Sequence, residues 1–392
     1  MNVREKDKLF LGRDPLPMDL EVAGAEGSVV FDRQGRRYVD FVMGWCVGNL
    51  GWSHPDIQAA IKQSRSPAYV HPSCFYEPWA ELAELLASIA PRKLKKSFRA
   101  TSGTEAVEIA MQIAMTATQR RKFVSIEGSY HGNSIGAMSI GASEYRRQYG
   151  KLLPGCLKVE PPLDAKAVKK VERLLKRQDI AAFIMEPIIC NLDVTIPDPE
   201  FMTGVRALCR KHGTLFVMDE VATGFGRTGK LFGSQHFDVD PDIMCLAKAV
   251  TGGYAPMGAT MVTEAVARDV EETFSFYSTY AWHPLSVDVA LANVRYFIAH
   301  RDELLGHVIE MSAYFEARLA QMKFGFPTTL RVKGLAIGVE VKEPGYAAKL
   351  QDKCLQAGLI FSVEQDVLKF FPALTIEQQI AREGLDILEA SL

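Results

Sequence analysis

Short apolar runs alternate with segments of helical spacing through the middle of the chain. The runs are SFRAT (97–101), FVSI (123–126), AAFIMEP (181–187), TLFVMDEV (214–221), DIMCLAKA (242–249) and ATMVT (259–263). Between them, segments such as 103–118 and 200–212 repeat apolar residues at the period of an amphipathic helix. This alternation predicts an α/β fold, with a mainly parallel sheet covered by helices on both faces.

The two ends of the chain follow a different pattern. Residues 27–42 form two β-rich runs around a polar turn that ends in Gly35, which predicts a hairpin. Residues 285–322 have helical spacing, and they precede a pair of strand-like segments near 328–342 and 359–371 and a last helix from about residue 376. We expect these ends to form a smaller α+β domain.

The expected organisation has three parts. Residues 1–50 would be the N-terminal segment of the small domain, 51–283 the large α/β domain and 284–392 the C-terminal part of the small domain. A chain of 392 residues has room for more than one packed unit.

Charge and cysteine usage narrow the class of protein. The 45 basic and 47 acidic residues nearly cancel and form no block of one sign, so we expect neither a nucleic acid nor a membrane partner but a small metabolite. The seven cysteines contain no C-x-x-C pair, which argues against a disulfide framework or a metal site. The N-terminus has no apolar signal core and no run of 18 apolar residues exists, so a cytoplasmic protein is expected.

The residues that follow the apolar runs are the first candidates for chemistry, because ligands of open parallel sheets bind beyond the carboxyl ends of the strands. After SFRAT come Ser102, Gly103 and Thr104, at the start of a helical segment. A helix N-terminus of this kind can bind phosphate through free N–H groups. A plain N-cap by Ser102 or Thr104 is the other interpretation, and it is favoured when the segment is taken alone.

Three further strand ends carry distinctive side chains. Tyr130 follows FVSI and could lie over a flat heterocycle, or could line a loop. Asp219 ends an apolar strand, where a carboxylate needs a partner such as a protonated ring nitrogen, a salt bridge or a helix cap. Lys248 follows DIMCL and could be an amine that attacks carbonyls, or a surface lysine.

Residues 224–229 match the pattern G-x-G-x-x-G but fit a nicotinamide site poorly. A dinucleotide site requires a helix to begin at this motif and an acidic residue about 20 positions later. The following segment, LFGSQHFDVDPD, has neither helical spacing nor a helix start. We therefore interpret these glycines as shaping a loop.

The order of the strand-end residues is more informative than any one of them. An anion site, an aromatic ring, an acid and a lysine together suit a phosphorylated, cationic ring that carries an aldehyde. At this point the sequence resembles the class III (ω-type) pyridoxal-phosphate (PLP) aminotransferases, and residues 218–253 are similar to diaminopelargonate aminotransferases. The resemblance rests on TSGTEAVEIAM (101–111), GSYHG (128–132), MEPI (185–188), MDEVATGFGRTGKLF (218–232), LAKAVTGG (246–253) and STYAWHPLS (278–286).

The resemblance implies PLP as cofactor and PLP fold type I, with a seven-stranded sheet domain and a small domain built from both chain ends. It implies that Gly103 and Thr104 bind the cofactor phosphate with Ser102 nearby. Tyr130 would stack on the ring and Val221 would pack on its other face. Asp219 would pair with the ring nitrogen with support from Glu186, and Lys248 would form a Schiff base. Thr279 would reach the phosphate of a neighbouring subunit, which implies a homodimer with shared sites.

The sequence departs from the family at positions that bear on the substrate. Asn133, Asn191 and Ala222 stand where an arginine, an acidic residue and a glutamine are common, and Lys369 stands where an arginine commonly binds carboxylate. Arginine binds carboxylate through a bidentate contact and lysine does so less well, which favours a substrate amine far from any carboxylate, or a donor other than glutamate. The expected substrate pocket contains Lys369 and an aromatic set: Trp45, Phe75, Tyr76, Trp282 and His283.

The expected reaction moves an amino group from a primary, terminal amine or an amino acid to a keto acid or aldehyde by a ping-pong mechanism. The main alternative is an aminomutase of the glutamate-1-semialdehyde type, which the E-P-x-x-x-N spacing of Glu186 and Asn191 favours and which would need no acceptor. A non-enzymatic PLP-binding regulator is a third interpretation, weakened by the presence of Lys248 and the lack of an attached DNA-binding domain.

Overall fold

A seven-stranded sheet forms the centre of the computed structural model, which describes residues 1–12, 18–91 and 93–392. The strand order is β4-β10-β9-β8-β7-β5-β6. The bounds are β4 (Leu94–Ala100), β5 (Lys122–Ile126), β6 (Cys156–Val159), β7 (Ile180–Met185), β8 (Leu215–Asp219), β9 (Ile243–Leu246) and β10 (Gly258–Thr263). Only β10 runs antiparallel to its neighbours in this sheet, which confirms the predicted mainly parallel α/β fold.

Six of the seven strands coincide with the predicted apolar runs, but β6 was not predicted. It has four residues, lies at the sheet edge and leaves most of its side chains partly exposed, so it lacks an apolar run. The predicted runs also extend past β7, β8 and β9. These strands end at Met185, Asp219 and Leu246, immediately before or at the residues that face the site.

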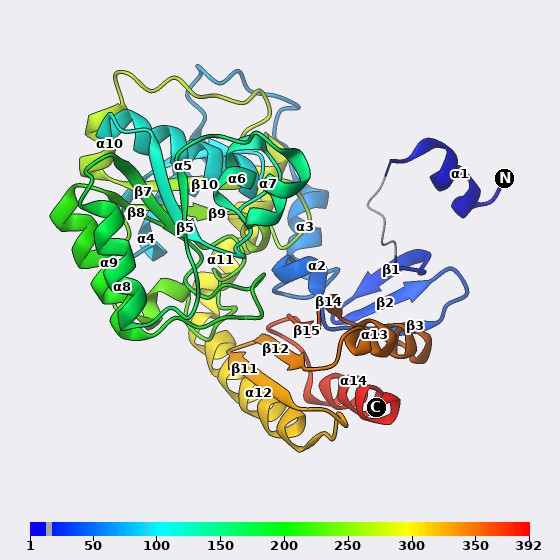
Figure 1. The fold of residues 1–392 in the computed structure, drawn as a ribbon. Helices are drawn as coiled ribbons and strands as arrows, with labels where there is room; N and C mark the ends of the chain where they lie inside the picture. Colours follow the sequence, from blue (N-terminus) through cyan, green and yellow to red (C-terminus); the bar gives the residue numbers. More distant parts are fainter. Residues whose placement is uncertain (13–17, 92) are drawn as a thin grey trace.

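Helices cover both faces of the sheet (Figure 1). One face packs against α8 (Ala165–Leu175) and α9 (Pro199–His212), and the other against α5 (Gly103–Thr118), α6 (Ile135–Ile140) and α10 (Glu264–Val270). All six side chains of β7 are buried, with Phe183 in the first core and Ile184 in the second. A strand between two helical layers is therefore apolar throughout rather than alternating.

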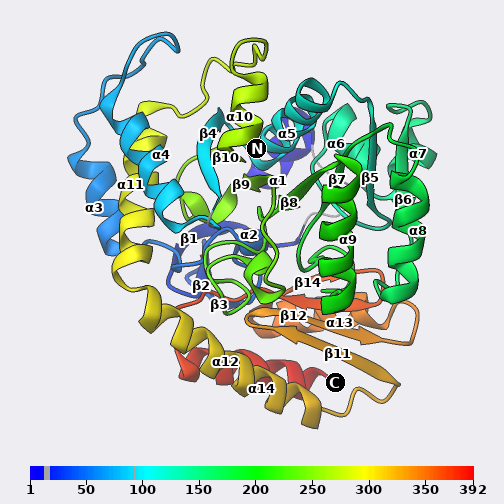
Figure 2. The ribbon, with the colours of Figure 1, turned by 90° about the vertical axis from the view of Figure 1, so that its left-hand side faces the viewer.

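The two ends of the chain meet in a second part of the molecule (Figures 1 and 2). The predicted hairpin is present as β2 (Val29–Asp32) and β3 (Arg37–Asp40), with β1 (Val22–Glu26) beside β2. The C-terminal strand β13 (Leu359–Ile360) pairs in parallel with β3. This pairing joins the chain ends, as the fold prediction requires; the residue boundaries of the domains stay predictions.

A four-stranded antiparallel sheet, β11-β12-β15-β14, lies next to this junction. Its strands are β11 (Thr328–Lys333), β12 (Ala336–Val341), β14 (Ser362–Glu364) and β15 (Val367–Phe370). The predicted helical stretch 285–322 is two helices, α11 (Pro284–Ala299) and α12 (Arg301–Gln321), and the last helix is α14 (Gln378–Ser391). Helix α13 (Tyr346–Ala357), between the predicted strands, was missed.

The remaining elements are short or peripheral: α1 (Val3–Phe10), α2 (Met43–Cys46), α3 (Pro55–Gln63), α4 (Glu77–Ile89) and α7 (Ser143–Tyr149). Residues 224–229 form turns and begin no helix, in agreement with their interpretation as a loop. Across the part of the chain that the structure describes, no helix is long and apolar enough to cross a membrane. No cluster of three or more metal-ligating side chains occurs among the same residues.

Candidate active site

A cavity of about 640 Å³ lies at the carboxyl ends of the sheet strands. The wall of the cavity also includes residues of the short helix α2, Lys369 of β15 and Phe371 directly after β15. Ten of the residues predicted from the sequence line it: Trp45, Ser102, Gly103, Thr104, Tyr130, Glu186, Asp219, Val221, Lys248 and Lys369. The structure therefore brings the strand-end constellation together in one place.

The start of α5 forms one end of the cavity. Ser102 is the N-cap, and its hydroxyl accepts a hydrogen bond from the backbone N–H of Glu105 at 3.2 Å. This hydrogen bond confirms the interpretation of Ser102 as an N-cap. The first N–H groups of any helix have no partner within the helix. Capping by Ser102 is therefore compatible with anion binding at Gly103 and Thr104.

Two glycines keep this end of the cavity open. A Cβ on Gly103 would lie 2.9 Å from Val221 Cγ1, and a Cβ on Gly132 would lie 2.3 Å from Thr104 Oγ1. Gly132 also has φ +123°, in the region that favours glycine. The close approach of these loops makes a backbone-lined cradle of the kind that holds phosphate.

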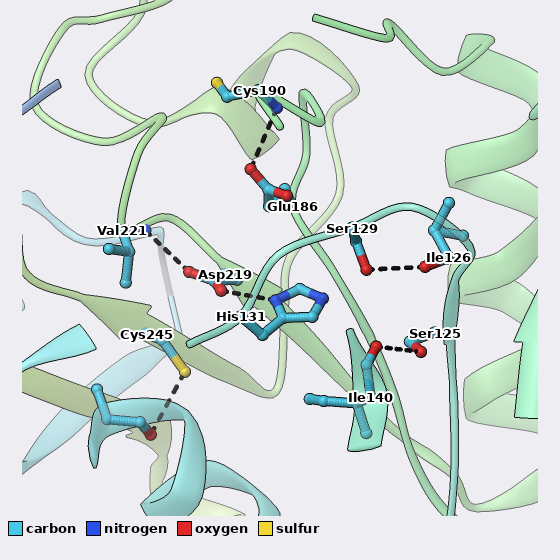
Figure 3. A network of polar contacts seen from close by, with 11 residues as sticks. Ser125, Ile126, Ser129, His131, Ile140, Glu186, Cys190, Asp219, Val221 and Cys245 are labelled. Carbon is cyan, nitrogen blue, oxygen red and sulfur yellow. Dashed lines mark hydrogen bonds and ion pairs between the residues drawn. The ribbon is translucent and has the colours of Figure 1, made fainter. Parts of the chain in front are cut away.

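Asp219 lies at the end of β8 and is a buried residue of the site. It is 3% exposed, and its Oδ2 is 2.7 Å from Nδ1 of His131 (Figure 3). Its Oδ1 accepts a hydrogen bond from the backbone N–H of Val221 at 3.1 Å. The carboxylate is thus held in one orientation beside the cavity. The sequence did not single out His131, although this residue lies inside the GSYHG motif.

The neighbouring Glu220 is a buried acid that binds backbone groups outside the cavity. Its carboxylate accepts hydrogen bonds from the backbone N–H groups of Gly233 and Ser234, both at 2.8 Å, and does not line the cavity. Because successive residues of a strand point to opposite sides, only one of the two adjacent acids can face the site. The acid that faces the site is Asp219.

Glu186 follows β7 and lines the cavity next to Asp219. It is 4% exposed, and its Oε2 accepts a hydrogen bond from the backbone N–H of Cys190 at 3.1 Å (Figure 3). Burial, reinforced by the negative charge of Asp219, raises the pKa of Glu186 to about 8. Glu186 is therefore mostly protonated at neutral pH, so two buried acids lie together without two negative charges.

Lys248 begins a short 3-10 helix (Lys248–Val250) directly after β9. Its backbone φ is +45°, an uncommon conformation for a residue with a side chain. The side chain lines the cavity, and its charge acts on both Glu186 and Cys46. Lys248 is therefore part of the site and not a lysine of the outer surface.

The N-terminal wall of the cavity is a left-handed turn. Met43, Gly44, Trp45 and Cys46 have φ values of 47°, 61°, 57° and 66°. Left-handed backbone is unfavourable for residues with a Cβ. The turn is anchored by Asp40, whose carboxylate accepts hydrogen bonds from the backbone N–H groups of Val42 and Met43 at 2.8 and 2.9 Å.

Two buried cysteines that the sequence did not single out also line the cavity. Burial alone would raise the pKa of the Cys46 thiol. A hydrogen bond from the Cys190 thiol and the positive charges of nearby side chains outweigh this and lower the pKa of Cys46 to about 6; those side chains are Arg227, Lys248 and Lys369.

Several predicted pocket residues lie elsewhere. Trp282 is 2% exposed and its indole N–H donates to the Gly258 carbonyl at 2.8 Å, so its assignment to the pocket is wrong and it belongs to the core. Tyr76 bonds Ser66 at 2.9 Å, in a separate depression. The presence of an aromatic residue in the sequence does not indicate whether its ring faces the cavity or the core. Phe75, His283 and Thr279 do not line the cavity of this chain either.

The fold and the cavity together define a PLP-binding α/β enzyme, because the cradle, the fixed buried acid and the lysine suit the phosphate, the ring nitrogen and the aldehyde of that cofactor. The family model described as Aminotransferase class-III matches residues 11–392. The chain belongs to the class III aminotransferases and is a PLP-dependent aminotransferase. The likeness of residues 218–253 to diaminopelargonate aminotransferases stays a prediction.

Known proteins resemble the chain over almost its whole length. It is 37% identical to the acetylornithine aminotransferase of Methanosarcina mazei over 396 residues, covering 99% of this chain and 95% of the relative. It is 35% identical to the putrescine aminotransferase of Pectobacterium atrosepticum, covering 92% and 81%. The structure of a taurine:2-oxoglutarate aminotransferase from Bifidobacterium kashiwanohense matches with a TM-score of 0.91 at 27% identity, covering 98% and 96%.

Proposed function

We propose that Lys248 holds PLP as a Schiff base and that the chain transfers the amino group of a terminal amine to a keto acid or aldehyde. The observation that carries this proposal is the position of Lys248 in one cavity with the α5 N-terminus and the buried Asp219. Putrescine, the amine named for one relative, has no carboxylate, which agrees with the absence of an arginine at position 369.

The residues of the cavity have separable roles in this proposal. The N–H groups at the start of α5 and the hydroxyl of Thr104 bind the phosphate. Asp219 keeps the ring nitrogen protonated, and His131 keeps Asp219 oriented toward it. Tyr130 and Val221 hold the ring between them.

Proton transfer is assigned to Lys248. PLP, when bound, supplies an electron-poor ring that accepts the electron pair left as the substrate carbon loses its proton. Nζ of Lys248 would remove that proton and return one on the product side. The protonated Glu186 adds no negative charge beside Asp219.

We also propose a homodimer in which Thr279 reaches the neighbouring subunit. Support comes from exposed aromatic side chains on two loops, among them Phe75, Tyr277 and Tyr280. The rings of Tyr69 and Tyr280 contact each other edge to face at 6.4 Å, which places the two loops side by side. Large exposed aromatic groups of this kind mark interaction surfaces. A cytoplasmic location is proposed as well, supported by seven cysteines that are all free.

The experiment for this proposal is a donor panel with pyruvate and 2-oxoglutarate as acceptors. Terminal amines are expected to convert either acceptor into its amino acid, with parallel lines in double-reciprocal plots as ping-pong kinetics requires. No amino acid product with any donor would refute the proposal. Product formation without any acceptor would instead identify the aminomutase alternative.

A further inference from the structure

Two cysteine thiols from distant parts of the chain lie together on the wall of the cavity. Cys46 is the last residue of α2, and Cys190 lies in the loop that follows β7. They are 2% and 6% exposed, both are free thiols, and both line the cavity that contains Lys248. The Cys190 thiol donates a hydrogen bond to the sulfur of Cys46. The aminotransferase function proposed above gives neither thiol a role.

The backbone and the surrounding core hold both thiols in place. Cys46 has a left-handed backbone, with φ 66°, and its N–H donates to the carbonyl of Val42 at 3.4 Å. The N–H of Cys190 donates to Oε2 of Glu186 at 3.1 Å. Both cysteine side chains belong to one buried apolar cluster that also contains Phe371. The two sulfurs therefore meet without any rearrangement of the chain.

A buried arginine supplies positive charge to this pair. Arg227 is 0% exposed, and its guanidinium group donates to two backbone carbonyls and, at 2.6 Å, to Oδ1 of Asn49. Within the part of the chain that the structure describes, no carboxylate pairs with Arg227, and its Nε has no hydrogen-bond partner. A buried cation is unfavourable without a negative charge nearby. The anionic groups that act on Arg227 are the sulfurs of Cys46 and Cys190.

The same interactions make the two thiols chemically different. Burial raises the pKa of Cys46, but the hydrogen bond from Cys190 and the charge of Arg227 outweigh burial, so that the pKa is about 6. Donation of that hydrogen bond, together with burial, raises the pKa of Cys190 well above its usual range. At neutral pH, Cys46 is therefore mostly a thiolate, while Cys190 keeps its proton. A thiolate next to a second thiol is the arrangement of oxidant-sensitive cysteines.

We propose that Cys46 and Cys190 form a modification site for small hydroperoxides, in which Cys46 is the nucleophile and Cys190 the resolving thiol. The sulfur of Cys46 attacks one peroxide oxygen and becomes a sulfenic acid. The O–O bond breaks, and the leaving hydroxide or alkoxide takes a proton from solvent. The sulfur of Cys190 then attacks the sulfur of Cys46, the S–O bond breaks, and water leaves with the proton of Cys190. The two thiols give two electrons to the peroxide and become a disulfide.

The burial of both sulfurs limits the oxidant to a small molecule that can enter the cavity. The disulfide would join the N-terminal segment, through α2, to the loop at the end of a central strand of the large sheet. It would also remove the negative charge next to Arg227. The chemistry needs neither PLP nor an amine substrate, so its test is independent of the proposed aminotransferase function.

The test treats the holoenzyme with hydrogen peroxide at pH 7, blocks the remaining thiols with iodoacetamide and analyses the peptides without reduction. The expected product is a pair of peptides joined through Cys46 and Cys190, which dithiothreitol separates. Cys74→Ser is the control, because it removes an exposed thiol outside the cavity, and it should give the same joined peptides. No joined peptide, or a joined pair that contains another cysteine in place of either one, would overturn the proposal.

Two single variants test the separate roles of the thiols. In Cys190→Ser, dimedone, a reagent for sulfenic acids, should label Cys46 when it is added together with peroxide. In Cys46→Ser, labelling of Cys190 should be at least about tenfold weaker, because a protonated thiol is a poor nucleophile. Equal labelling in the two variants, zero included, would refute the assignment of the roles. The experiment on the parent protein needs no substitution, so it decides the existence of the site even where a variant does not fold.

Discussion

The protonated state of Glu186 predicts how stability depends on pH. The folded protein raises the pKa of this carboxyl from 4.5 to about 8, first through burial and then through Asp219. Between these two values the folded state binds more protons than the unfolded state, so the free energy of unfolding must fall as pH rises. The contribution of Glu186 is fully present below pH 4.5 and is lost as the pH passes 8.

The magnitude follows from the shift. A rise of about 3.5 pH units corresponds to at most about 5 kcal/mol at alkaline pH. For 392 residues the unfolding entropy is about 0.8 kcal/mol/K, so the effect on Tm is at most about 6 °C. Glu186→Gln keeps the shape of the protonated acid and cannot ionise. The variant should therefore melt close to the parent at pH 5 and several degrees above it at pH 9.

Thermal melts between pH 5 and pH 9 measure this difference. PLP is first released from Lys248 with a competing amine and then removed by dialysis, so that titration of the cofactor does not contribute. Glu340→Gln, which alters the partly buried ion pair of Arg331 and Glu340 outside the cavity, is the control and should follow the parent at every pH. Parallel curves for Glu186→Gln and the parent would show that Glu186 is ionised in the fold, and the reasoning about the two adjacent acids would be wrong.

Three other predictions concern the cradle, the thiol pair and the buried carboxylate. Gly132→Ala places a Cβ 2.3 Å from Thr104 Oγ1, so PLP affinity, followed by absorbance titration, should fall at least about tenfold without loss of the fold. Because the Cys46 pKa is about 6, its alkylation by iodoacetamide should rise to half its maximum near pH 6. A midpoint near that of free cysteine, about 8.5, would contradict this. His131→Phe leaves the carboxylate at the end of β8 buried without its partner, and chemical unfolding should show a loss of about 3–5 kcal/mol; a loss below about 1 kcal/mol would refute the pairing.

The cofactor side of the site could be predicted from the sequence because its determinants are local. The strands β7, β8 and β9 end within the apolar runs that predict them, and the residues at these strand ends lie at the same edge of a parallel sheet. Asp219, Lys248 and the start of α5 are placed by this rule alone. The alternation of strands and helices likewise predicted the layers of the fold.

The substrate side could not be predicted in the same way because its contacts join distant segments. Glu364 and Asn191 are 173 residues apart, and no local pattern links them. The left-handed turn at Trp45 carries a single glycine, Gly44, and Asp40 accepts hydrogen bonds from the backbone at its start. Trp282 is aromatic like a pocket residue but fills the core, since burial depends on the packing of the whole chain.

The most direct measurement is the site of covalent attachment of the cofactor. Borohydride reduction of the PLP-loaded protein, followed by peptide mass analysis, should find the pyridoxyl group on the peptide that contains Lys248 and on no other lysine. Lys248→Ala should keep the fold but give no labelled peptide. A label on another lysine, or unchanged labelling in the variant, would contradict the assignment of Lys248 to the reaction.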